Sequence, residues 1–170
     1  MSAKDAFFKK VQENNDSQAS RIERAKEDIQ TFRARMKTLV SQVDEWLKGS
    51  GVEVTIIENE YHDDSISIMT GNTSNLGRYL VNSVRLKNDT KTASITPIAI
   101  YGYGAAGRAV LTLENPNRAP RTTKYFLTLD KDDLSWYIHP ENQPAARPGQ
   151  PRQRDPLSEE SFFRAIETLA

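Results

Sequence analysis

Three glycines, Gly102, Gly104 and Gly107, form a GxGxxG pattern directly after an apolar run. In dinucleotide-binding proteins this pattern joins a strand to a helix, and the N-terminus of that helix receives the pyrophosphate. Here the residues after Gly107 read RAVLTLENP, a short β-rich run that stops at Pro116. Because a strand and not a helix follows the glycines, the pattern predicts a hairpin loop or a bulge and no bound cofactor.

A second group with residue types suited to chemistry surrounds one histidine. His62, Asp63 and Asp64 are consecutive, and Glu58 and Glu60 precede them. These side chains are of the kinds that bind metal ions or transfer protons. A site for a hard metal ion would need ligands at a defined loop spacing with a glycine turn, and this run has no such glycine. We therefore interpret it as an exposed acidic turn.

The rest of the chain offers no recognisable catalytic set. No serine has the sequence context of a nucleophile elbow. The absence of cysteine removes thiol nucleophiles, cysteine-ligated metals and disulfides, and it fits a reducing compartment. We therefore predict no catalytic, cofactor-binding or metal-binding residues, and we expect that the protein is not an enzyme.

The charge balance also excludes some partners. Lys and Arg together number 23, as do Asp and Glu, so no overall field attracts nucleic acid or an anionic membrane. The N-terminus has no apolar run of signal-peptide length, and no segment approaches the ~20 apolar residues of a membrane span. We expect a cytoplasmic protein that binds neither nucleic acid nor membrane.

The elements that position these residues begin with a helical segment, residues 1–49. From Ser2 to Lys48 the chain has no Gly or Pro and repeats apolar residues with a heptad period. The a positions are Phe8, Asn15, Ile22, Ile29, Met36 and Val43, and the d positions are Val11, Gln18, Ala25, Phe32, Leu39 and Trp46. The polar run from Asn14 to Ser17 favours a break, so the segment is either one projecting helix or a helical hairpin whose longer helix begins near Gln18.

The heptad seam leads to two packing predictions. From Met36 onward the apolar stripe widens, so Met36, Leu39, Val43 and Trp46 are expected to pack on the rest of the fold. Farther toward the N-terminus, Ile22, Ile29 and Phe32 also need a partner, since an uncovered patch of this size is unusual. That partner would be either Phe8 and Val11 of a folded-back first helix or a second copy of the chain.

Residues 51–139 have the two-residue period of β-strands. Strands are predicted over residues 52–58, 65–69, 78–86, 92–101, 108–113, 124–129 and 134–139. Their short connections favour an antiparallel meander, because parallel pairing would need crossover helices. Residues 140–156 are rich in proline and predict a linker, and residues 157–170 predict a short helix capped by Ser158. The prediction is one α+β domain: a long N-terminal helix or helical hairpin packed on an antiparallel β meander, with a short C-terminal helix.

This layout resembles small immunity proteins encoded beside bacterial polymorphic toxins, including toxins delivered by type VI secretion. The resemblance lies in the opening AKDAFFKKVQ, the helix end EWLKGSGVEV and the close PLSEESFFRAIETLA, which cover both ends of the chain. It implies a non-enzymatic cytoplasmic protein that binds a cognate toxin and blocks its active site. No residue role is transferred, because such families contact their toxins through different surfaces.

Two other functions remain open at this stage. A structural or adaptor protein would self-associate through the heptad seam, and a small hydrolytic or ligand-binding domain would use a pocket under the glycine-rich loop. For the immunity function, the densest acidic run outside the helices is the predicted partner-binding surface: Glu58, Glu60, Asp63 and Asp64. An exposed acidic patch would speed the approach of a toxin with a basic active-site cleft.

Overall fold

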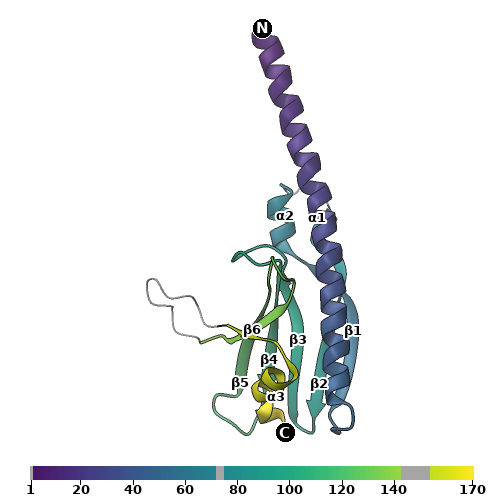
Figure 1. Cartoon of the computed structure of the whole chain (residues 1–170), viewed down its shortest axis with the longest axis vertical. Helices are drawn as coiled ribbons and strands as arrows, with labels where there is room; N and C mark the ends of the chain where they lie inside the picture. Colours follow the sequence, from purple (N-terminus) through teal and green to yellow (C-terminus); the bar gives the residue numbers. More distant parts are fainter. Residues whose placement is uncertain (1, 72–74, 143–153) are drawn as a thin grey trace.

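The computed structural model describes residues 2–71, 75–142 and 154–170. The elements are helix α1 (Ala3–Leu47), strand β1 (Glu53–His62), helix α2 (Asp64–Met69), the 3-10 turn η1 (Asn75–Gly77), strands β2 (Arg78–Asn88), β3 (Lys91–Ala99), β4 (Gly107–Glu114), β5 (Thr122–Leu129), β6 (Trp136–Pro140) and β7 (Asp155–Pro156), helix α3 (Glu159–Ala165) and the 3-10 turn η2 (Glu167–Leu169). Helix α1 crosses the sheet and extends well past it, while α3 lies at the opposite end of the molecule (Figure 1).

The strands form one sheet of seven in the order of the sequence, and every neighbouring pair is antiparallel. This confirms the predicted α+β fold and the meander. The turn between β2 and β3 is short and places Asp89 at a positive φ of 57°, a conformation that Asp tolerates better than most residues. Buried residues alternate along β4 at Gly107, Ala109, Leu111 and Leu113, as expected for a sheet with one covered face.

Helix α1 is a single helix of 45 residues, so the predicted break near Asn14 is wrong. Its start is fixed by a capping box in which Ser2 and Asp5 bond each other's backbone amides. Each residue of low helix propensity costs only a few tenths of a kcal/mol, about 0.7 at most. The Gln12 side chain also donates a hydrogen bond of 3.1 Å to Asp16, four residues on, which supports the helix across the polar run.

The helix packs on the sheet earlier than the sequence indicated. Its buried residues begin at Ala25, not at Met36, and they are Ala25, Ile29, Phe32, Met36, Leu39, Val40, Val43 and Leu47. Ile29 and Phe32 are therefore covered by the sheet. The expectation that they pack on a folded-back first helix or a second copy is wrong, because one straight helix leaves this part of the seam facing the strands. Ile22 is only half-buried.

The third glycine of the GxGxxG pattern lies in β4 and allows α1 to approach the sheet. A Cβ at Gly107 would lie 2.3 Å from Cδ1 of Phe32, far inside a normal carbon contact. The Phe32 ring also meets Tyr79 edge-on at 6.3 Å between centroids and lies 6.4 Å from the Trp136 ring. As predicted, Gly102 and Gly104 lie in the β3–β4 connection, and both have positive φ.

The short run 65–69 forms helix α2, so the strand predicted there is wrong. Asp63 precedes it as the N-cap and accepts a hydrogen bond of 3.0 Å from the Ser65 amide. This cap satisfies an amide that has no partner within the helix. In a strand, Ile66 and Ile68 would lie on the same face. Here Ile66 is buried and Ile68 is exposed, as expected for two residues on opposite sides of a short helix.

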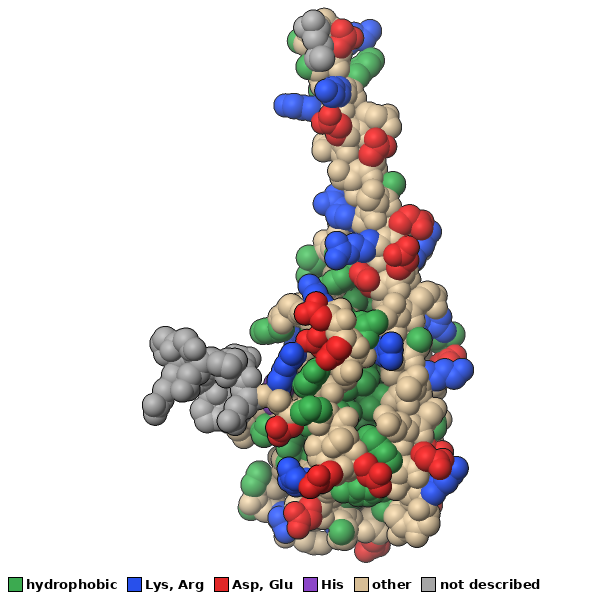
Figure 2. Space-filling model, viewed as in Figure 1, with side chains coloured by type: hydrophobic (Ala, Val, Ile, Leu, Met, Phe, Trp, Pro, Cys, Tyr) green, Lys and Arg blue, Asp and Glu red, His purple; other side chains and the backbone are tan. Residues whose placement is uncertain are grey.

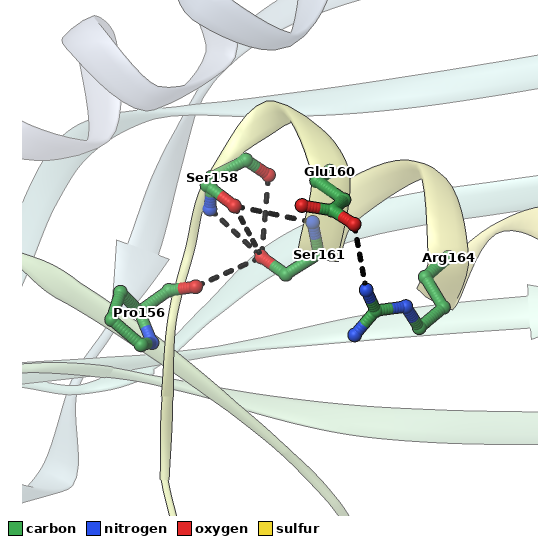
Figure 3. Close-up of polar contacts among 5 residues, drawn as sticks. All are labelled: Pro156, Ser158, Glu160, Ser161 and Arg164. Atoms are coloured by element: carbon green, nitrogen blue, oxygen red, sulfur yellow. Dashed lines mark hydrogen bonds and ion pairs between the residues drawn. The ribbon is translucent and has the colours of Figure 1, made fainter.

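Most of the predicted linker 140–156 lies outside the described residues. At its end the chain forms β7, a two-residue strand that pairs with β6 and was not predicted. The predicted C-terminal helix follows as α3, with Ser158 as its cap (Figure 3). Phe162 of α3 is fully buried, and its ring lies 5.3 Å from the half-buried Trp46 ring of α1.

Candidate functional site

The structure separates the four predicted partner-binding residues. Asp63 is only 1% exposed, so its assignment to an exposed turn is wrong. Its carboxylate accepts hydrogen bonds from the Tyr79 hydroxyl at 2.8 Å and from the Ile100 amide at 2.9 Å, besides those from the Ser65 amide and hydroxyl. These bonds join α2, β2 and the end of β3, which gives Asp63 a structural position and removes it from any contact surface.

The tyrosines around Asp63 remain neutral hydrogen-bond donors. Burial raises the pKa of Tyr79 well above its usual range, and the negative charge of Asp63 and its hydrogen bond raise that pKa further. Burial also raises the pKa of Tyr61, with a further contribution from Asp63. The Tyr61 hydroxyl donates to the Ile98 carbonyl. Tyr61 and Tyr79 therefore act as hydrogen-bond donors in this polar cluster.

Glu58, Glu60 and Asp64 are exposed, as predicted. Strand β1 runs to His62, farther than the predicted end at residue 58, so both glutamates lie within the strand. The Glu60 carboxylate is 4.0 Å from the Arg78 guanidinium, and Asp64 is 3.5 Å from Nε2 of His62. Within the described residues, no three His, Asp or Glu side chains are arranged to hold a metal ion.

A pocket of about 510 Å³ lies where the β3–β4 connection meets α1. A small hydrolytic or ligand-binding domain would need a pocket at this place, beside the glycine-rich loop. The described residues that line it are Arg24, Asp28, Thr31, Met69, Ile100, Tyr101, Ala105, Ala106, Lys131 and Leu134. The set contains no Ser, His or Cys. Its one carboxylate, Asp28, accepts a hydrogen bond of 2.5 Å from the Tyr101 hydroxyl and lies 3.9 Å from Arg24.

Tyr101 also lacks the properties of a proton acceptor in this pocket. Burial raises its pKa well above the usual range, and the hydrogen bond to Asp28 raises it further. The hydroxyl thus stays protonated and bound to the carboxylate. The pocket can accept a small molecule, but its described side chains supply no nucleophile paired with a base.

Among the residues that the structure describes, the longest exposed stretch is the first part of α1, residues 3–17, which we call the N-terminal arm. Every residue in it is exposed, and Gln18 is the first residue of the helix whose side chain bonds another element, at the Thr70 carbonyl. At 1.5 Å per residue the arm is about 22 Å long. It extends as a single helix beyond the sheet and α2 (Figure 1).

The arm carries apolar side chains in water. Phe7 is 62% exposed, Phe8 58% and Val11 42%, and the two phenyl rings lie 6.2 Å apart. Apolar and charged side chains are interspersed along this end of the molecule (Figure 2). Nζ of Lys4 lies 5.4 Å from the centre of the Phe8 ring. The sequence had indicated Phe8 and Val11 as seam residues, but Phe7 falls outside the heptad a and d positions and was missed.

No described helix is long and apolar enough to cross a membrane. Comparisons with protein-family models, curated proteins and solved structures found nothing that matches this chain.

Proposed function

We propose that this chain is a non-enzymatic immunity protein that binds a cognate toxin and occludes its active site. The observation that carries the proposal is the N-terminal arm with Phe7, Phe8 and Val11 in water. Burying one such side chain in an interface is worth about 1.5–3 kcal/mol. An amphipathic helix that lays its apolar face in a groove is a common mode of protein recognition.

The arm gains stability from such a partner for a second reason. The packed part of α1 nucleates the helix, but no tertiary contact from the described residues supports the turns of the arm, so they fray more readily than the packed turns. Asn14, Asn15, Asp16 and Ser17 lower the helix propensity of the arm further. A groove that covers the phenylalanines would offset both costs, and the part of the helix that enters an active-site cleft would exclude substrate.

The test is co-expression of the chain with the product of the neighbouring gene in a susceptible bacterium. We expect the neighbour to stop growth alone and growth to recover in the presence of the chain. Phe7→Ser with Phe8→Ser should abolish recovery and weaken binding of the purified toxin by more than about tenfold. Ile68→Ser is the matched control, because this side chain is 78% exposed but lies on α2. A neighbour that is harmless, or one that the chain does not neutralise, would contradict the proposal.

The same arm supports one alternative, a self-associating adaptor. Two copies that pair their arms would bury Phe7, Phe8 and Val11 against each other, as in a coiled coil. Light scattering during size-exclusion chromatography separates the two functions. A dimer that becomes a monomer in the Phe7→Ser, Phe8→Ser variant favours the adaptor, whereas a monomer in both cases leaves the arm free for a toxin.

A further inference from the structure

Besides the N-terminal arm, the outer edge of β1 is a surface without a bound partner among the described residues. This strand is ten residues long and pairs with β2 on one side. In the described ranges of the chain, no strand pairs with its other side. Free edges of this length are usually protected by proline, charged side chains, a bulge or a covering segment. Strand β1 contains no proline and no lysine or arginine, so its protecting charges are glutamates alone, which repel acidic strands but not basic ones. Strand β7 at the opposite edge has only two residues, one of them Pro156.

The hydrogen bonds at the end of the β1–β2 pair indicate which backbone groups face this edge. The Asp63 amide donates to the Gly77 carbonyl at 2.6 Å, and these two residues continue the register that pairs Tyr61 with Tyr79. In an antiparallel ladder, pairs that exchange hydrogen bonds alternate with pairs that do not. The Tyr61–Tyr79 pair is therefore of the hydrogen-bonded kind, and the Glu60–Leu80 pair is not.

A contact on β2 independently supports this alternation of hydrogen-bonded and non-hydrogen-bonded pairs. The Leu80 carbonyl accepts a hydrogen bond of 2.7 Å from Nε of Arg33, so it points away from β1. Its register partner, Glu60, then has its own amide and carbonyl on the opposite side, at the free edge. The residues of β1 that present backbone donors and acceptors outward are Ile56, Glu58 and Glu60, together with Val54 and His62 at the ends.

We propose that the free edge of β1 binds an extended segment of a partner protein by strand addition, and that Glu58 and Glu60 select a segment with Lys or Arg at alternating positions. Strand addition draws affinity from the backbone and specificity from alternate side chains. That the partner is the toxin rests on the function proposed above. The edge itself is defined by the outward backbone groups of β1 and the side chains beside them, whichever protein supplies the segment.

A second copy of the chain fits this edge poorly. In the register that centres two antiparallel β1 strands on Glu58, this carboxylate faces its own copy directly. In the neighbouring register of the same phase, Glu58 faces Ile56 and lies diagonal to the other Glu58. Like charges in such positions destabilise strand pairs. Opposite charges stabilise them, so a basic segment is the better occupant.

The basic side chains near the edge do not hold Glu58 and Glu60 in strong ion pairs, so these glutamates can pair with a basic segment. Arg33 and Lys37 of α1 line a shallow depression beside Glu58, but the Arg33 guanidinium already bonds Leu80 and Gln30. Arg78 reaches Glu60 only at 4.0 Å, and both side chains are more than half exposed. Exposed pairs of this kind contribute little and exchange readily.

The first experiment uses the full chain and two synthetic probes, a heptapeptide of alternating Lys and Val and the same peptide with Glu in place of Lys. By calorimetry at low salt, we expect the Lys peptide to bind at least about tenfold more tightly. In amide hydrogen exchange it should slow Ile56, Glu58 and Glu60, and leave Ile57 and Asn59 unchanged because β2 already protects them. Equal affinities, no binding, or protection elsewhere in the chain would overturn the proposal.

The second experiment changes the edge itself. Glu58→Pro removes an outward amide without breaking the ladder to β2, since proline is tolerated on the solvent side of an edge strand. It should reduce binding of the Lys peptide at least about tenfold, while Glu58→Gln, which keeps the amide, should reduce it less. Glu58→Lys with Glu60→Lys should reverse the preference toward the Glu peptide. This pair of exposed charges leaves the fold intact and decides the question if the proline variant fails to fold. Wild-type preference in the reversed variant would refute the proposal.

The two proposals fail in different ways. If the chain neutralises the neighbouring toxin and Glu58→Pro neutralises it equally well, the edge proposal is wrong and the immunity function stands. If the Lys peptide binds the edge as described but the chain protects against no neighbouring product, the edge is a binding surface and the immunity function is wrong.

Discussion

Gly107→Ala tests how closely α1 packs on the sheet. The added methyl carbon would lie 2.3 Å from Cδ1 and 2.6 Å from Cε1 of Phe32, whereas carbon atoms normally pack about 3.5–4.0 Å apart. Phe32 is fully buried and cannot swing into solvent. Overpacking of a filled core costs about 1–3 kcal/mol, and removing a glycine from a strand interior otherwise gains about 0.5–1 kcal/mol.

We therefore expect Gly107→Ala to lower the free energy of unfolding by about 1–2 kcal/mol, which corresponds to roughly 2–8 °C in Tm for a domain of this size. The assay is a double-mutant cycle by urea denaturation. Phe32→Ala alone should cost about 3–5 kcal/mol. In that background the methyl group of Gly107→Ala enters the vacated space and should be neutral or stabilising, so the coupling energy should exceed about 1 kcal/mol.

Gly104→Ala is the matched control. Its φ of +69° penalises alanine, but nothing lies within 4 Å of the added carbon. It should cost about 1–2 kcal/mol from backbone strain alone. That cost should be the same with and without Phe32. If Gly107→Ala also costs the same in both backgrounds, the steric argument is refuted.

Three further predictions concern contacts away from this packing site. Asp63→Asn should lower the free energy of unfolding by about 3 kcal/mol, because the new side-chain NH2 group would replace a carboxylate oxygen and point at hydrogen-bond donors. Asp64→Asn, at an exposed position, should change the free energy of unfolding little. Arg154 bonds Asp130 at 2.9 Å and lowers the pKa of that carboxyl, so the stabilisation is present above the unfolded pKa of about 3.9 and is lost as the pH falls through the folded value. Arg154→Gln should return the pKa of Asp130 toward its usual range in an NMR titration, and an unchanged value would contradict this cause. Trp46→Ala should cost about 2 kcal/mol, less than the loss of a fully buried aromatic ring, because Trp46 is half-buried against α3; an unchanged Tm would show that this contact is without effect.

The fold was predictable because each element carries its own local signal. A run of 45 residues without glycine or proline specifies a helical segment, although the polar residues near Asn14 wrongly favoured a break in it. Short β-rich runs with short turns specify an antiparallel meander. The same logic placed the cap at Ser158 and the glycine-rich loop correctly. These signals do not depend on what the elements touch, so they could be interpreted without tertiary contacts.

The errors arose where tertiary contacts decide the outcome. The run at residues 65–69 alternates like a strand, but a cap at Asp63 and one buried face at Ile66 favour a single helical turn and a half. The burial of Phe32 depends on Gly107, which is far away in the sequence. No local pattern indicates that an aromatic side chain of a helix will pack on a glycine of a strand. The sequence therefore predicts a folded-back helix or a second copy as the partner of Ile29 and Phe32, in place of the sheet.

Asp63 shows why the candidate surface was only partly predictable. Composition groups it with Glu58, Glu60 and Asp64, but its carboxylate accepts hydrogen bonds from α2, β2 and the segment after β3. The number of donors that reach a carboxylate is a property of the folded chain. The remaining three acidic residues are exposed, and their role in partner binding remains a prediction.

The buried Asp63 also connects the two proposed contact surfaces. On one side it follows β1 directly and ends the edge strand that carries Glu60. On the other side it caps α2, and the carbonyl of Thr70, the C-cap residue of α2, accepts the hydrogen bond from Gln18 at the base of the N-terminal arm. Helix α2 lies beside α1 at the point where the arm leaves the body of the molecule (Figure 1). Loss of the Asp63 hydrogen bonds should therefore loosen the arm base and the end of β1 together. Amide hydrogen exchange of Asp63→Asn would show faster exchange in both places, whereas a change confined to α2 would show that the arm and the edge are held independently.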